Sequence, residues 1–236
     1  MNDSTFDRVF RSSGVLFVVL FIVAYLIRGA LPEMGASADT LASFYVDDRG
    51  AVLIGTFLLA FNLLNLLWFA AALSRDLRDA GQGIWASAAT AASAVLGGVF
   101  LVVLAASAAV AYPPAGSGSE TLMSTLNDLA GAAGVLIWLP VAMLIMAGTF
   151  GLWQAKAISN AVFTVGVVVV VAGVVGATTW ASDGIWAPDG AYARVILPIA
   201  ALAWIAILSA VLTSRAPSPV RIPESAAVTP TPSPAR

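Results

Sequence analysis

The sequence predicts an all-α protein, a polytopic transmembrane helical bundle with six spans and both termini in the cytoplasm. Three observations predict this class. Of the 236 residues, 60% are hydrophobic and only 10% are charged, whereas a soluble domain has about 25% charged residues. Six apolar stretches approach or exceed the length of about 20 residues that a membrane-spanning helix needs. Arginine and lysine gather in alternate loops, which is the pattern of the positive-inside rule.

The apolar stretches set the order of the predicted elements: they cover residues 14–31, 51–73, 84–112, 129–153, 158–181 and 191–212. The chain then divides into a cytoplasmic N-terminal segment (1–13), a transmembrane domain (14–212) and a tail (213–236). The tail is rich in proline and small polar residues, so it cannot bury a core and is predicted to be disordered and cytoplasmic.

The first stretch has a second interpretation as a cleaved signal peptide. Ala36, Ser37 and Ala38 have the small-residue pattern of a cleavage site. Arg28 and Glu33 lie between the apolar run and that site. They make the connection unusually long, which favours a first span that stays in the protein.

The charges predict the orientation. With the N-terminus inside, eight basic and five acidic residues lie on the cytoplasmic side, giving +3. Three basic and eight acidic residues lie outside, giving −5, and the two sides sum to the net charge of −2. The preference for arginine over lysine, with much alanine, valine and glycine, indicates a GC-rich bacterial genome. The predicted location is therefore the bacterial cytoplasmic (inner) membrane.

The composition excludes several kinds of chemistry. There is no cysteine and no histidine, which removes disulfides, thiolate catalysis and the usual zinc sites. The middle of the predicted spans contains no Asp, Glu or Lys, so no proton relay or acid–base pair is expected. No basic surface with aromatic residues indicates nucleic-acid binding. We expect no cofactor, no metal and no enzymatic activity.

Two asparagines stand out in the second stretch, AFNLLNLLWF. Asn62 and Asn65 are three residues apart and share one face of a helix. Small residues of the third stretch, among them Ser93, are the predicted hydrogen-bond partners across the helix interface. The alternative is that the asparagines line a hydrated cavity or a ligand site.

A charged rim is predicted at the outer ends of the spans. Its members are Arg28, Asp47, Asp48, Arg49 and Arg194. The three arginines depart from the positive-inside trend, so nearby carboxylates are expected to form ion pairs with them and join the helix ends. The other interpretation is an anion site built from two or three arginines.

Pro140 lies in the middle of the fourth stretch. It has no N–H to donate and is expected to kink or loosen this helix. The alternative is a gating hinge at this point.

The segment FYVDDRGAVLIGTFLLAFNLLNLLWFAAALSRDLRDAG resembles a family of bacterial, actinobacterial, six-helix integral membrane proteins of unknown function. The shared features are an acidic-arginine entry, an apolar helix and a basic-acidic cytoplasmic turn. The resemblance implies the six-helix fold and no particular activity.

These observations leave two functions open. The first is a non-catalytic accessory or structural protein, with the lipid bilayer around it and a second copy or another membrane protein as partner. The alternative is a small-molecule transporter or an intramembrane ligand-binding protein with its polar site at Asn62 and Asn65.

Overall fold

The computed structural model describes residues 3–112 and 120–214, with side chains from residue 9 onwards, so nearly all of the predicted tail lies outside the described residues. Every regular element in this part is helical. The elements are α1 (Asp3–Arg28), α2 (Ala38–Asp47), α3 (Arg49–Asp79), α4 (Gly83–Ala111), α5 (Glu120–Leu136), α6 (Trp138–Gln154), α7 (Asn160–Gly176), the π-helix η1 (Tyr192–Ile196) and α8 (Leu197–Ser214).

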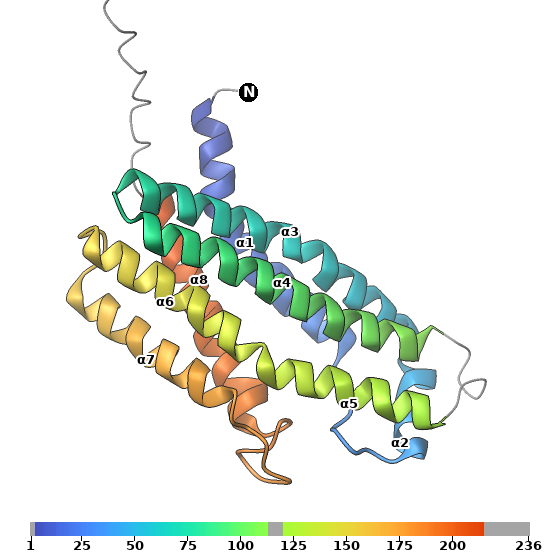
Figure 1. The fold of residues 1–236 in the computed structure, drawn as a ribbon. Helices are drawn as coiled ribbons and strands as arrows, with labels where there is room; N and C mark the ends of the chain where they lie inside the picture. Colours follow the sequence, from blue (N-terminus) through green and yellow to red (C-terminus); the bar gives the residue numbers. More distant parts are fainter. Residues whose placement is uncertain (1–2, 113–119, 215–236) are drawn as a thin grey trace, which may run out of the picture.

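The contacts between the long helices close into a ring; Figure 1 shows α3, α4, α6 and α7 side by side, with α1 and α8 behind them. Helix α1 packs on α3, α3 on α4, α4 on α5 and α6, α6 on α7, α7 on α8, and α8 returns to α1. Short turns join α3 to α4 and α6 to α7; the turn between α3 and α4 has Gly81 at a φ of 77°, which favours glycine. We call the end of the ring where α1 ends and α3 begins the Arg28 end, and the opposite end the Arg11 end.

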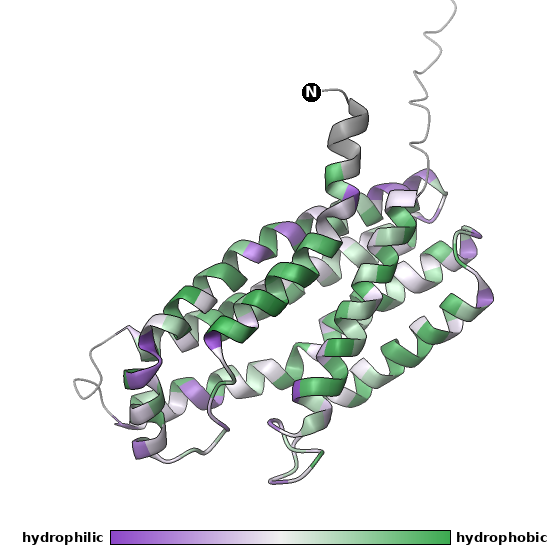
Figure 2. Cartoon of the chain, turned by 180° about the vertical axis from the view of Figure 1, so that it is seen from behind, coloured by the Kyte–Doolittle hydropathy of each residue, from purple (hydrophilic) through white to green (hydrophobic). Residues whose placement is uncertain are grey.

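The helices are apolar enough for a bilayer. Figure 2 shows hydrophobic residues along the helices and hydrophilic ones mainly towards the ends and loops. Among the described residues, five segments are long enough to cross a membrane: Val9–Arg28, Arg49–Asp79, Gly83–Ala111, Glu120–Gln154 and Tyr192–Ser214. Helix α7 has 17 residues, at the short limit for a span. The structure thus gives a multi-span membrane protein, with five candidate spans where the sequence predicts six.

Two prolines coincide with irregular helix geometry near the Arg28 end. The fourth apolar stretch is interrupted at Ile137, three residues before Pro140, where the proline ring crowds the preceding turn and leaves a carbonyl without its N–H partner. Pro198 in α8 cannot donate to the Arg194 carbonyl, and the turn that precedes it widens into η1. Such π-turns often occur at functional sites.

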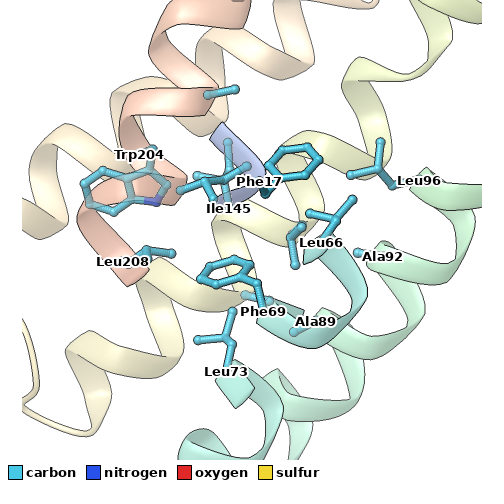
Figure 3. Packing of buried hydrophobic residues seen from close by; sticks show 14 of the residues in the cluster. Phe17, Leu66, Phe69, Leu73, Ala89, Ala92, Leu96, Ile145, Trp204 and Leu208 are labelled. Atoms are coloured by element: carbon cyan, nitrogen blue, oxygen red, sulfur yellow. The ribbon is translucent and has the colours of Figure 1, made fainter. Parts of the chain in front are cut away.

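The core fills the ring between α1, α3, α4, α6 and α8. Figure 3 shows Trp204 and Leu208 of α8 facing Phe69 and Leu73 of α3. Ala89 and Ala92 of α4 provide the small side chains that let α3 approach closely. The buried arginines lie towards the two ends of the ring, and the candidate site is at the end that holds Arg28.

Candidate functional site

A cavity of about 210 Å³ opens at the Arg28 end of the ring. Residues from the end of α1, the loop after it, α4, α5, α6 and the start of α8 line it. Its ionisable groups are Arg28, Asp189 and Arg194, and Tyr25 and Asn127 add polar groups. Ile137 and Pro198, at or beside the two irregular turns, also line it. The cavity thus lies where the bundle departs from regular helices.

Close packing of α1 on α3 fixes the backbone of Arg28. A Cβ atom added at Gly55 would lie 2.5 Å from the Cβ of Arg28 and 3.0 Å from the carbonyl oxygen of Ala24. Only glycine permits this approach. The Arg28 side chain therefore starts from a tightly packed point and runs to the cavity wall.

The Arg28 guanidinium is buried without a partner. The residue is 9% exposed. Its Nε and Nη1 atoms have no hydrogen-bond partner within the part of the chain that the structure describes. A buried charge without a partner costs several kcal/mol, and ionisable groups inside a membrane domain mark functional sites by default. The cavity therefore contains a cation that its own fold does not neutralise.

Tyr45 does not supply a counter-charge for Arg28. Burial raises the pKa of Tyr45 to about 12, and the neighbouring Arg28 charge offsets this rise only in part. The phenol is therefore protonated and neutral at pH 7. Asp189 lines the same cavity but forms no ion pair with either arginine among the described residues.

Arg194 faces the cavity from the turn before α8. Its Nη2 donates to the carbonyl oxygen of Leu31 at 3.0 Å. Asn127 of α5 donates to the carbonyl oxygen of Glu33 at 2.9 Å, and Asp128 accepts from the backbone N–H of Gly35 at 2.8 Å. These bonds tie the loop after α1 to α5 and to η1, so the cavity walls are held together by specific contacts.

The structure places Asn62 and Asn65 elsewhere, inside the packed helices. They are 0% and 4% exposed. Asn62 donates to the carbonyl oxygen of Phe17 at 2.8 Å, and Asn65 donates to Oδ1 of Asn62 at 3.1 Å. The pair thus joins α3 to α1, whereas the sequence predicts the third stretch as the partner. Neither asparagine lines the Arg28 cavity.

We expect Asn62→Cys and Asn65→Cys to resist a small membrane-impermeant thiol reagent under conditions that label Ser37→Cys completely. The packed amides leave no path for water, whereas Ser37 is exposed at the start of α2. The chain has no native cysteine, so labelling reports only the introduced thiol. The measurement is made from both membrane sides, and labelling of either asparagine position would show a hydrated path.

Ser93 forms no hydrogen bond with either asparagine. It is buried and donates to the carbonyl oxygen of Thr90 on its own helix at 2.9 Å. The neighbouring row Thr90, Ala94 and Gly98 is exposed on α4. Association with a second copy stays a prediction.

The predicted ion pairs of the outer rim are not formed among the described residues, where Arg28, Arg49 and Arg194 have no carboxylate partner. Arg49 instead donates to the carbonyl oxygens of Ala111 and Tyr112 at 3.0 and 2.6 Å. Asp47 and Asp48 are exposed at the junction of α2 and α3. Arg49 thus bonds to carbonyls at a helix end and Arg194 to a loop carbonyl, where the sequence predicts carboxylates.

A buried ion pair at the Arg11 end is absent from the sequence-based candidates. Nη2 of Arg11 lies 3.0 Å from Oδ1 of Asp76, and both side chains are at most 9% exposed. Nη1 of Arg11 donates to the carbonyl oxygen of Leu212 at 2.8 Å. One guanidinium thus joins α1, α3 and α8. The residues are 65 positions apart, and no sequence spacing links them.

Comparison of the chain with protein-family models, with curated proteins and with solved structures gave no match. The resemblance to six-helix bacterial membrane proteins therefore stays an expectation. The helix lengths, hydropathy and packing establish the coarser class: the chain is a multi-span helical membrane protein.

Proposed function

We propose that this protein is a non-catalytic integral membrane protein that binds a small anion in the Arg28 cavity. The observation that carries the proposal is the Arg28 guanidinium, which is buried, lacks a hydrogen-bond partner on two of its nitrogens and lines a cavity with a second arginine. A guanidinium offers a fixed fork of N–H donors that matches a carboxylate or phosphate. An anion there would supply the missing charge and the missing acceptors.

This proposal places the ligand-binding function away from the asparagines. Asn62 and Asn65 satisfy each other and α1, so they have little to offer a ligand. Arg28 and Arg194 contribute two positive charges to the cavity, and Asp189 contributes one negative charge. The excess of positive charge favours an anion over a cation.

The proposal includes a membrane topology. We take α7 as the sixth span and place both termini in the cytoplasm of a bacterial cell, which the distribution of arginine supports. The Arg28 end then faces away from the cytoplasm. An anion would reach the cavity from the outer side of the inner membrane. A protein that then releases the anion on the cytoplasmic side is a transporter; one that only binds it is a sensor.

The test is thermal unfolding of the protein in phosphatidylcholine nanodiscs, followed by tryptophan fluorescence. Sodium acetate, hexanoate and phosphate are compared with sodium chloride at equal ionic strength. A ligand at ten times its Kd stabilises by about 1.4 kcal/mol, so we expect at least one anion to raise Tm by about 3–5 °C. Arg28→Gln should abolish this rise.

Arg49→Gln is the matched control. It removes the same charge at the same end of the bundle, but Arg49 is exposed and does not line the cavity. The anion-dependent rise in Tm should survive in this variant. A rise of the same size in Arg28→Gln, or no rise in the native protein, would contradict the proposal.

A further inference from the structure

We infer that the ligand of the Arg28 cavity is a single-chain anionic amphiphile, with a carboxylate-like head at Arg28 and a short apolar tail inside the ring. This inference rests on the proposed function and names the class of ligand. It follows from a second cavity that adjoins the first.

The second cavity has a volume of about 140 Å³ and an entirely apolar lining. It lies between α1, α3, α4, α6 and α8. Figure 3 shows four of its lining residues, Phe17, Leu66, Leu96 and Ile145, each from a different helix. An apolar cavity of this kind stays dry, because water would find no hydrogen-bond partner in it. It therefore suits a hydrocarbon group.

The two cavities share part of their walls. Phe100, Ile137, Trp138 and Pro198 line both of them. Ile137 is the residue at which the fourth apolar stretch is interrupted, and Pro198 follows the π-helix. The two cavities are therefore neighbours, and we place the charged end of the ligand at Arg28 and its apolar end in the second cavity, beyond these four side chains.

The volume limits the length of the tail. An apolar cavity of about 150 Å³ takes up a molecule of the size of benzene, so 140 Å³ corresponds to about six carbon atoms. Octanoate and hexanoate have tails of about this size. The two long chains of a bilayer phospholipid do not fit, so we assign the ligand to the pool of free amphiphiles rather than to the bilayer.

The experiment measures Kd values for acetate, butanoate, hexanoate, octanoate and dodecanoate by titration calorimetry. The full chain is held in phosphatidylcholine nanodiscs at pH 8, and the heats of empty discs are subtracted. Burial of one methylene tightens binding about fourfold. Each step from acetate to butanoate to hexanoate adds two methylenes, so we expect a gain of about 15-fold at each of these steps and little gain beyond octanoate. Octanol and octylammonium should bind at least tenfold more weakly than octanoate.

A variant that fills the second cavity distinguishes the contribution of the apolar tail to binding from that of the charged head. Ala201 of α8 is buried in its wall, so Ala201→Leu should weaken octanoate binding at least tenfold and leave acetate unchanged. Ala203→Leu, exposed on the same helix, is the matched control and should behave as the native protein. The chain-length series needs no variant, so it stands even where Ala201→Leu does not fold.

The outcomes distinguish the two proposals. Equal Kd values along the series, with binding still lost in Arg28→Gln, would overturn the amphiphile and keep the anion site. Binding that is independent of Arg28 would overturn both. Competition by phosphatidylglycerol placed in the discs would show that a bilayer lipid is the occupant and would overturn the assignment to a free amphiphile.

Discussion

Replacing Arg11 by methionine is expected to lower the free energy of unfolding by about 3–5 kcal/mol, the usual effect of breaking a buried ion pair. The Arg11–Asp76 pair is at most 9% exposed, with Nη2 and Oδ1 3.0 Å apart. The variant leaves the Asp76 carboxylate without its Arg11 partner in a shielded place and removes the bond to the Leu212 carbonyl. The effect is large because three helices meet at this one guanidinium.

The measurement is equilibrium unfolding in mixed micelles with increasing sodium dodecyl sulfate. Arg78→Met is the control, since Arg78 is exposed in the last turn of α3 and its interaction with the helix dipole is worth at most about 1 kcal/mol. The double variant Arg11→Met, Asp76→Asn should lose less free energy of unfolding than the sum of the losses in the two single variants, because the two groups interact. Equal effects of Arg11→Met and Arg78→Met would disprove the role of the pair.

Replacing Arg28 by methionine is expected to raise the free energy of unfolding of the ligand-free protein by about 1–4 kcal/mol, the range found when buried ion pairs are replaced by apolar side chains. Methionine keeps the Cβ atom that packs on Gly55 and most of the side-chain length. It removes a buried charge that has no partner on Nε and Nη1. If Arg28 stabilised the fold, its replacement would lower the free energy of unfolding.

Arg49→Met provides the comparison for this prediction. Arg49 donates to two carbonyl oxygens at the end of α4, so its loss should destabilise the protein slightly. Both variants lose one positive charge from the same end of the bundle. A loss of stability in Arg28→Met as large as in Arg49→Met would show that Arg28 is a structural residue.

Much of the fold is predictable from the sequence because the bilayer imposes it. A span needs a long apolar run, and the five candidate spans overlap five of the six predicted runs. Helix α7 is the exception because regular helix ends at Gly176, five residues before the end of the predicted run. The interruption at Ile137 follows from Pro140, since the effect of proline on a helix is local.

The candidate site is less predictable because it depends on contacts between distant residues. Arg28 and Arg194 appear in the predicted rim. Their sequence positions do not predict that Nε and Nη1 of Arg28 lack a partner or that Arg194 bonds to the Leu31 carbonyl. The second cavity is lined by ordinary apolar side chains from five helices. No local pattern marks such a space, because it arises from how the helices pack.

If the protein keeps a buried, unneutralised Arg28 for an anionic ligand, that ligand should stabilise the native protein and not Arg28→Met. Unfolding of the native protein and of Arg28→Met is measured with and without saturating octanoate. We expect Arg28→Met to be the more stable protein without octanoate, and only the native protein to gain stability when octanoate is added. An Arg28→Met protein that is less stable without octanoate and still gains from it would contradict the account.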